Sequence, residues 1–232
     1  MFNQPNFTSP PAPITGKDVK SARSALRLIT ARHGARADMP SDRFAIRQVT
    51  GQRERLASEQ LVRRMYAWRG YRCAAPDHRN GDAQRMTLAA WCDGELAATM
   101  TLTVDHGQGL LCETLYPREI AALRDGSKRL CEYSRFAIDP EFSSPKLLRA
   151  FFRSAYDLAC HVLKATHAVI EVNPRHRRFY EQELGFRRLG AVHTCQRVEA
   201  PAQLLHCALD RPLPTMLRDA PPPTQISLAD AA

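Results

Sequence analysis

Two charged residues interrupt a segment that otherwise has the composition of a buried strand. Glu132 and Arg135 stand within Leu130-Cys-Glu-Tyr-Ser-Arg-Phe-Ala-Ile138. Burying an unpaired ion is costly, so charges in an apolar strand usually pair or serve chemistry. A carboxylate here can act as a general base toward an amine, and the planar guanidinium of Arg135 can orient it or bind a substrate carboxylate. The alternative is a structural ion pair between Glu132 and Arg135.

A second polar group follows the next predicted strand. The strand predicted at 168–173 ends at Asn173. The sequence Pro-Arg-His176 follows and leads into a short helix that carries Tyr180 and ends at Gly185. Tyr180 can protonate a leaving thiolate, or it can be a core aromatic that seals the helix. The eight histidines show no metal-ligand spacing, and the seven cysteines include no Cys-x-x-Cys pair. We therefore expect no metal site.

Hydrophobic periodicity predicts the elements that position these residues. Strands are predicted at 44–49, 87–92, 95–105, 130–138, 168–173, 191–198 and 205–209. Helices are predicted at 54–68, from 116, at 146–164 and just after 173. Asp93-Gly94 is a strong hairpin signal. The polar loop 72–85 is long enough to cover a substrate.

Both ends of the chain differ in composition from the middle. Residues 1–40 are proline-rich and then basic, and residues 211–232 carry five prolines without apolar periodicity, which predicts a disordered tail. Residues 41–210 are left as one domain. The basic stretch can form an amphipathic helix on a membrane surface, or a frayed or core-packed N-terminal helix. The lack of a large aromatic anchor favours the second.

Composition narrows the classes of partner. The net charge is +9, yet aromatic residues do not interleave with the basic ones, and no DNA-binding motif spacing occurs, so we expect no nucleic-acid partner. An acidic protein or an anionic substrate fits better. With 44% apolar residues, no membrane-spanning window and no signal-peptide core in residues 1–13, we expect a cytoplasmic protein.

The order of these elements resembles the GCN5-related N-acyltransferase superfamily. A hairpin, a Glu-bearing strand, a long helix, a strand and Asn173-x6-Tyr180-x5-Phe186 follow one another. Within the superfamily, Glu132-x-x-Arg135 and Asn173-Pro-Arg-His176 resemble the long-chain N-acyl amino acid synthases of the FeeM type. These enzymes are related to the LuxI-type acyl-homoserine lactone synthases, which share Glu-x-x-Arg.

The resemblance implies an α/β (α+β) fold with a central mixed sheet flanked by helices. Two parallel strands splay so that a pantetheine arm inserts between them and presents its thioester to an amine. It implies no bound cofactor, only an acyl-phosphopantetheine thioester as co-substrate. Glu132 is then the base, acting through water, and Tyr180 the acid. A strand N–H near Tyr133 to Phe136 is the expected oxyanion donor, and Ser134, Arg135 and Phe136 are expected to contact the substrate.

One departure from acetyl-CoA-dependent relatives bears on the acyl donor. Their glycine-rich turn before the long helix binds pyrophosphate, whereas residues 139–146 contain no glycine. Ser144 and Lys146 can hold the single phosphate that an acyl-carrier protein presents. Carrier proteins are acidic, and the remaining residues predicted to contact pantetheine or carrier are Arg149, Arg153, Asn173 and Arg175.

Residues near the first helix are candidates for the acceptor. Arg64 and Arg69 can clamp an amino-acid carboxylate, or they can belong to a solvated helix face. Asp82, in the polar loop, can contact the acceptor amine or simply be solvated.

The expected function is therefore transfer of a long-chain fatty acyl group from acyl-carrier protein, or from acyl-CoA, to the α-amine of an amino acid. The alternatives are an acyl-homoserine lactone synthase, an acetyl-CoA-dependent N-acetyltransferase, and a non-catalytic module that binds acyl-carrier protein. Glu132 argues against the non-catalytic module.

Overall fold

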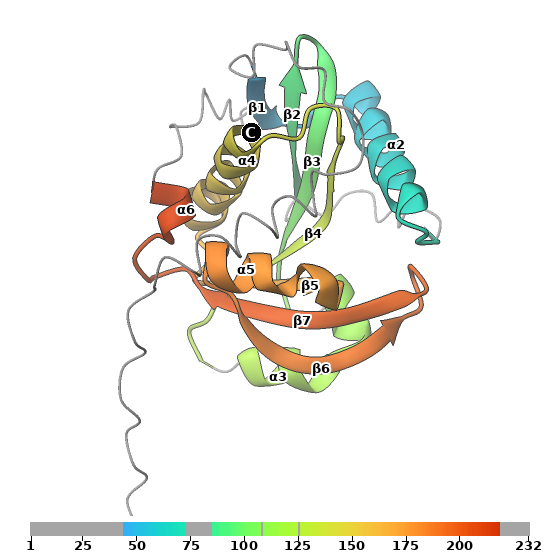
Figure 1. The fold of residues 1–232 in the computed structure, drawn as a ribbon. Coiled ribbons are helices and arrows are strands. Elements are labelled where there is room, and N and C mark those ends of the chain that lie inside the picture. The colour runs from blue at the N-terminus through green and yellow to red at the C-terminus, as the bar shows by residue number, and fades with distance from the viewer. Residues whose placement is uncertain (1–43, 73–84, 108, 125, 219–232) are drawn as a thin grey trace, which may run out of the picture.

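The computed structural model describes residues 44–72, 85–107, 109–124 and 126–218, which form a seven-stranded sheet with helices on both faces (Figure 1). This confirms the predicted mixed α/β fold class. The strands are β1 (Phe44–Gln48), β2 (Arg85–Cys92), β3 (Glu95–Val104), β4 (Leu130–Ile138), β5 (His167–Val172), β6 (Arg187–Cys195) and β7 (Ala200–Ala208). The helices are α2 (Gln52–Trp68), α3 (Pro117–Leu123), α4 (Pro145–Asp157), α5 (Arg177–Leu184) and α6 (Thr215–Arg218), with short 3₁₀ segments η1 (Leu111–Thr114) and η3 (Pro174–His176).

The strand order is β1-β2-β3-β4-β5-β7-β6. Among these neighbours, β4 and β5 are parallel and every other pair is antiparallel. A parallel pair needs a crossover, which α4 provides. The hairpin predicted at Asp93-Gly94 is confirmed, since both residues have the positive φ, 48° and 87°, that a tight hairpin turn favours.

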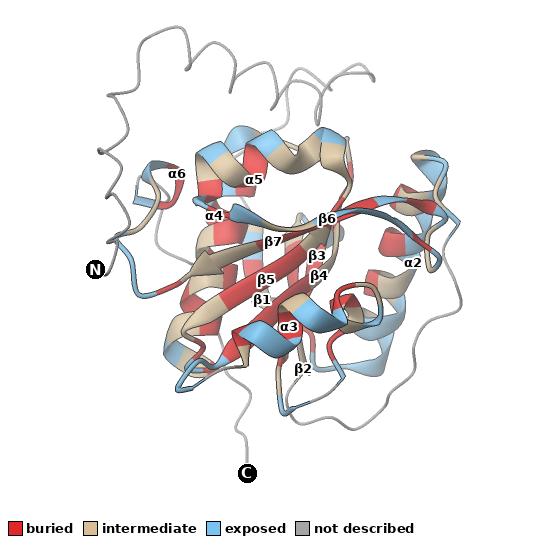
Figure 2. Ribbon diagram, turned by 90° about the horizontal axis from the view of Figure 1, so that it is seen from below, coloured by how far each residue is buried: buried red, intermediate tan, exposed pale blue. Residues whose placement is uncertain are grey.

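Each face of the sheet has its own apolar cluster. On one face α4 buries Leu147, Phe151 and Ala155, and α5 adds Phe179 and Leu184. On the other face lie α2, packed on Ala137 of β4, and the η1–α3 segment, packed on Val169 of β5. In Figure 1, α2 and α4 lie on opposite sides of β2–β4, and Figure 2 shows the central strands as buried.

An extra residue in β4 forms a bulge against β3. Thr99 is opposite Ala137 and Thr101 is opposite Ser134, so β4 contains one residue more than β3 over this interval. Arg135 lies there with φ 53°, a left-handed conformation that costs a non-glycine residue on the order of 1–3 kcal/mol. The bulge inverts the alternation of side chains, because Tyr133 before it and Ile138 after it join the same cluster.

The parallel strands β4 and β5 separate immediately before this bulge. Their ladder runs from Leu130 opposite His167 to Tyr133 opposite Ile170. Beyond it, β4 pairs with β3 alone and β5 continues along β7. The splayed pair expected from the family resemblance is therefore confirmed.

The helix that follows β4 begins as its sequence predicts and ends earlier. The hydroxyl of Ser144 accepts a hydrogen bond from Leu147 N at 3.1 Å, and Pro145 occupies the first turn. The predicted helix over 146–164 is α4 to Asp157, followed by one π-helical turn at Leu158–Val162.

The C-terminal part differs most from the sequence prediction. Strands expected at 191–198 and 205–209 span 187–195 and 200–208. Pro201, which lacks an N–H, lies near the start of β7, opposite Thr194. Residues 211–218, predicted as the start of a disordered tail, include α6 with Met216 and Leu217 buried. Residues 1–40 and 219–232 lie outside the described residues.

Candidate active site

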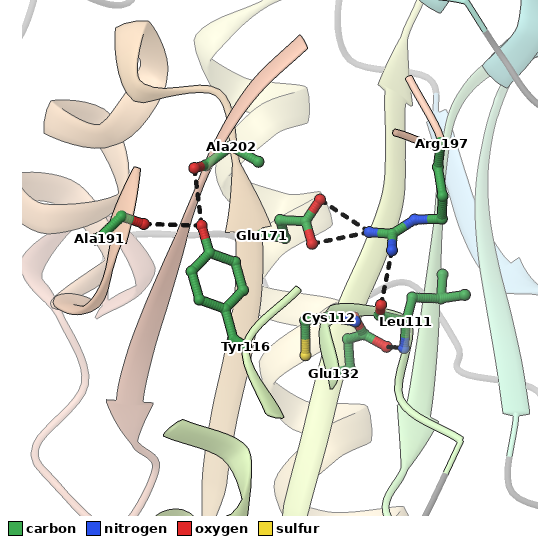
Figure 3. Close-up of polar contacts among 8 residues, drawn as sticks. All are labelled: Leu111, Cys112, Tyr116, Glu132, Glu171, Ala191, Arg197 and Ala202. Atoms are coloured by element: carbon green, nitrogen blue, oxygen red, sulfur yellow. Dashed lines mark hydrogen bonds and ion pairs between the residues drawn. The ribbon is translucent and has the colours of Figure 1, made fainter. Parts of the chain in front are cut away.

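Glu132 lies just before β4 and β5 separate, with 1% of its surface exposed. Its Oε2 accepts a hydrogen bond from Leu111 N at 2.7 Å, and its Oε1 accepts one from Cys112 N at 2.8 Å (Figure 3). These two amides begin η1, so the carboxylate satisfies N–H groups that a helix start leaves without intrahelical partners. The predicted alternative, an ion pair between Glu132 and Arg135, does not occur among the described residues.

Burial sets the protonation of Glu132. Removal from water raises the pKa of this carboxyl above its ordinary value, and the two backbone N–H donors oppose that rise without cancelling it. The same burial, with the carboxylate of Glu132 nearby, raises the pKa of the Cys112 thiol, which therefore stays protonated. A carboxylate with a raised pKa holds a proton more readily than an exposed one, which suits a general base.

A second carboxylate on β5 supports the same segment. Both oxygens of Glu171 accept hydrogen bonds from Arg197 Nη2, at 2.9 and 2.8 Å. Arg197 Nη1 also donates to Leu111 O at 2.8 Å (Figure 3). Leu111 is thus held through its N–H by Glu132 and through its C=O by Arg197. The first residue of η1 is fixed to β4 and, through Arg197, to β5.

Sequence reasoning missed both members of this ion pair. Glu171 interrupts the apolar run Val169-Ile-Glu-Val172 as Glu132 interrupts its own strand, so a signal was available. Arg197 lies in the turn between β6 and β7, where charges are ordinary and no pattern singles it out.

Tyr116, between η1 and α3, connects this region to the two C-terminal strands. Its ring is fully buried, and its hydroxyl donates to Ala202 O at 2.8 Å and lies 3.0 Å from Ala191 O (Figure 3). Gly190 of β6 lies against the ring, so closely that a Cβ there would stand 2.5 Å from Tyr116 Cε1. Any larger side chain at this position would therefore clash with the ring.

The three predicted substrate contacts at the bulge have different surroundings. Ser134 Oγ lies 3.4 Å from Thr101 O, and Arg135 is half-buried in its left-handed conformation. Phe136 packs on the α4 side, with its ring centroid 5.1 Å from that of Phe152. The bulge thus places these three residues on β4 beyond the last pair with β5.

Tyr180 of α5 is buried among aromatic rings. Its ring meets those of Phe152 and Phe186 edge-on, with centroids 6.1 Å apart in each case. Burial raises the pKa of its phenol, and the nearby phenol of Tyr66 raises it further, so the hydroxyl keeps its proton at neutral pH. Tyr180 is thus a core aromatic, and its predicted role in protonating the thiolate stays a prediction.

The two arginines predicted to bind the acceptor have different partners. Arg64 forms an ion pair with Asp139, which follows β4. Arg69 Nη1 lies 3.1 Å from Nε2 of His176, the last residue of the Asn173-Pro-Arg-His176 segment. Asp82 lies outside the described residues.

Residues predicted to face the acyl donor lie at the start of α4 and beyond β5. Lys146 is half-buried and Arg149 is exposed. Arg153 Nε donates to both oxygens of Asp157, at 3.0 and 2.9 Å, and its Nη1 donates to Leu217 O at 3.1 Å, which ties α4 to α6. The guanidinium of Arg153 therefore already has hydrogen-bond partners within the protein.

Two further donor-side candidates lie in η3, directly after β5. The side-chain oxygen of Asn173 accepts a hydrogen bond from Arg175 N at 3.1 Å and caps this 3₁₀ turn. Arg175 Nη2 donates to Tyr71 Oη at 2.6 Å. Asn173 thus has a clear structural role, and its predicted contact with pantetheine stays a prediction.

A hollow of about 360 Å³ lies on the α4 face, between α4, α5, the end of β7 and the segment around α6, and its lining includes the polar side chains of Gln182, Arg187 and Arg211. It is lined by Tyr133 of β4, Phe152 and Tyr156 of α4, and Phe186, with Leu213 and Leu217 from the segment around α6.

Among the described residues, no group of three or more His, Cys, Asp or Glu could hold a metal ion. In the same residues no helix is both long and apolar enough to span a bilayer.

Comparisons with known proteins agree with this geometry. The family model described as N-acyl amino acid synthase FeeM matches residues 57–208. The structure of FeeM, an N-acyl amino acid synthase from uncultured soil microbes, is 28% identical, with a TM-score of 0.65 over 72% of this chain and 91% of that one. No curated protein sequence matches the chain.

Two more distant structures share the fold. An acyl-CoA N-acyltransferase from Pseudomonas aeruginosa is 16% identical, with a TM-score of 0.51 over 72% of this chain and 99% of that one. The acyl-homoserine lactone synthase LasI is 14% identical, with a TM-score of 0.52 over 72% and 90%. At such identities the likeness shows the arrangement of the sheet and helices alone.

Proposed function

Because the chain belongs to the FeeM family of N-acyl amino acid synthases and is an N-acyltransferase, we propose that it transfers a long-chain fatty acyl group to the α-amine of an amino acid. The observation that carries the proposal is the separation of β4 and β5 after Tyr133 and Ile170, next to the bulge at Arg135. Strand backbone without a neighbouring strand can pair with the amides of a pantetheine arm.

The buried residues give the reaction a proton path. The acceptor nitrogen attacks the thioester carbonyl carbon, so a C–N bond forms and the C–S bond breaks. A proton leaves the nitrogen through water to Glu132, and the thiolate takes the phenolic proton of Tyr180. The raised pKa of Glu132 suits its role as proton acceptor, and burial keeps the phenol of Tyr180 protonated before the reaction. An N–H of β4 between Ser134 and Phe136 would stabilise the oxyanion.

The family match supports a long acyl chain rather than an acetyl group, and the partly apolar hollow on the α4 face, which Tyr133 and Phe152 help to line, is a candidate place for that chain. Of the two donors, acyl-carrier protein is favoured, because residues 139–146 contain no glycine-rich turn for the pyrophosphate of CoA. Ser144 and Lys146 at the start of α4 offer a hydroxyl and an ammonium for one phosphate.

Purified protein, given a long-chain acyl-carrier protein or the matching acyl-CoA with each of the standard amino acids, tests the proposal. We expect N-acyl amino acids, detected by mass spectrometry, with faster formation from the carrier-bound donor. Equal or faster use of acyl-CoA would contradict the choice of donor. Acylation of S-adenosylmethionine instead would support an acyl-homoserine lactone synthase, and no acylation of any amine would contradict the function.

Charge reversal on α4 tests the carrier surface. Arg149→Glu is expected to raise the KM for carrier-bound donor several-fold and to change kcat little, because exposed charges act mainly on encounter and are screened beyond ~8 Å at physiological salt. Arg153 is unsuitable for this test because its reversal would place a carboxylate beside Asp157. The matched control is Arg63→Glu, an exposed reversal on α2 on the other side of the sheet. An equal rise in KM for both variants would remove Arg149 from the docking surface.

A further inference from the structure

Two arginines from distant parts of the chain converge on one histidine. Arg69 follows the last turn of α2, and Arg175 and His176 form η3 after β5. Arg69 Nη1 and Arg175 Nε each lie 3.1 Å from His176 Nε2. Guanidinium groups only donate, so Nε2 of His176 is the acceptor and its proton is on Nδ1. Burial and the two guanidinium groups lower the pKa of His176 to about 4, which keeps the imidazole neutral.

The other contacts of these arginines are also neutral. Arg175 donates to the hydroxyl of Tyr71 and lies over its ring at 5.2 Å, and Arg69 lies over the ring of Trp68 at 5.4 Å. Elsewhere in the described residues arginines pair with carboxylates, as Arg197 does with Glu171. Within those residues no carboxylate lies at ion-pair distance from Arg69 or Arg175.

The positive charge of this pair has no carboxylate partner among the described residues, with Arg69 half-buried and Arg175 exposed. Burial and the neighbouring Arg175 both lower the pKa of Arg69, which shows that the two cations repel each other here. An anion bound between two guanidinium groups would relieve this repulsion and accept charge-assisted hydrogen bonds from both. His176 and Tyr71 hold the arginines in place before such an anion arrives, which lowers the entropy cost of binding.

The position of the pair relates it to the candidate active site. Arg69 acts electrostatically on the buried phenol of Tyr180, and η3 directly follows the strand that separates from β4. The donor phosphate is expected at the start of α4, beside Ser144 and Lys146, and not at this arginine pair. The two anionic groups of the reaction would thus have separate positions.

Resting on the proposed function, we infer that Arg69 and Arg175, held by neutral His176, bind the α-carboxylate of the acceptor amino acid. Two planar donor forks suit a planar carboxylate, and fixing it would orient the adjacent α-amine toward the thioester. The pair then selects free amino acids over amines that lack a carboxylate.

The test compares each standard amino acid with its carboxamide, which keeps the amine and side chain but lacks the charge. For the best acceptor, the wild-type enzyme should prefer the amino acid in kcat/KM by about 10- to 100-fold, as expected for hydrogen bonds to a charged group. In Arg69→Gln and Arg175→Gln this preference should fall several-fold, while kcat/KM for the carboxamide and KM for the donor change little. Arg178→Gln, an exposed position on α5, is the matched control.

Several outcomes would overturn the inference. They are a wild-type enzyme that does not distinguish amino acid from carboxamide, variants that slow both equally, and variants that raise donor KM alone, which would assign the pair to the donor phosphate. In all three cases amines are still acylated, so the proposed function stands. If no amine is acylated, calorimetric titration with the same amino acids and carboxamides still decides. Carboxylate-dependent binding that is lost in the folded variants supports the inference, and its absence contradicts it.

Discussion

Replacement of Glu132 by Gln is expected to lower turnover by ~10²-fold or more and to destabilise the protein as well. The rate falls because the amide cannot accept the proton of the acceptor amine. The fold suffers because the carboxylate oxygens accept hydrogen bonds from Leu111 N and Cys112 N. A Gln side chain turns its NH₂ toward one of these donors, and a buried donor without a partner costs about 1–3 kcal/mol. Thermal unfolding together with steady-state rates measures both effects.

A matched control separates the two effects. The double variant Glu171→Gln/Arg197→Gln removes the other anchor of Leu111 and leaves Glu132 in place. If Glu132 is the base, this variant loses stability but keeps the acidic limb of the pH–rate profile, which burial places above the pKa of an ordinary glutamate. Glu132→Gln should lose that limb. A Glu132→Gln enzyme with a near-wild-type rate at every pH would remove this residue from the mechanism.

Gly190→Ala is expected to lower the free energy of unfolding by about 2–3 kcal/mol, as overpacking of a filled core does. The new methyl would stand 2.5 and 2.6 Å from two carbons of the Tyr116 ring. That ring cannot retreat, because it is fully buried and its hydroxyl is held at the carbonyls of Ala191 and Ala202. A decrease in Tm of roughly 5–10 °C follows for a domain of this size, measurable by calorimetry.

The control for Gly190→Ala uses the neighbour that it strikes. In a Tyr116→Leu background the ring is absent, so the same substitution should cost much less, and a double-mutant cycle gives the coupling between the two positions. A cost that is equal in both backgrounds would place the strain in the backbone of β6 rather than against Tyr116.

The sequence predicted most of the elements because their patterns are local. The apolar face of α4, the turn at Asp93-Gly94 and the charges within β4 are all legible in short windows. The boundaries of β6 and β7 were wrong because β6 is mostly exposed and β7 begins at Ala200-Pro201, where proline is unusual within a strand. The short η1 and α6 segments have too few residues to show a period.

The partners of the site residues were harder to predict than the residues themselves. Glu132 was singled out correctly as a buried charge, but its partners are backbone amides about twenty positions earlier, which carry no side-chain signal. Arg69 and His176 lie 107 positions apart in the sequence, and their contact depends on how the end of α2 packs beside η3. Such long-range pairings follow from tertiary packing rather than from spacing.

Residues 209–218 lie beyond the family match but pack against the rest of the structure. The family match ends at residue 208, with the last strand. Yet Tyr156 donates to Leu209 O at 2.7 Å and Arg153 to Leu217 O, while Leu217 and Met216 cover apolar walls of α4 and α5. Ending the chain at residue 208 would therefore leave two hydrogen-bond donors of α4 without partners and expose apolar side chains of α4 and α5. Residues 209–218 thus belong to the packed structure although they lie beyond the family match, and truncation at residue 208 is expected to destabilise α4 and α5.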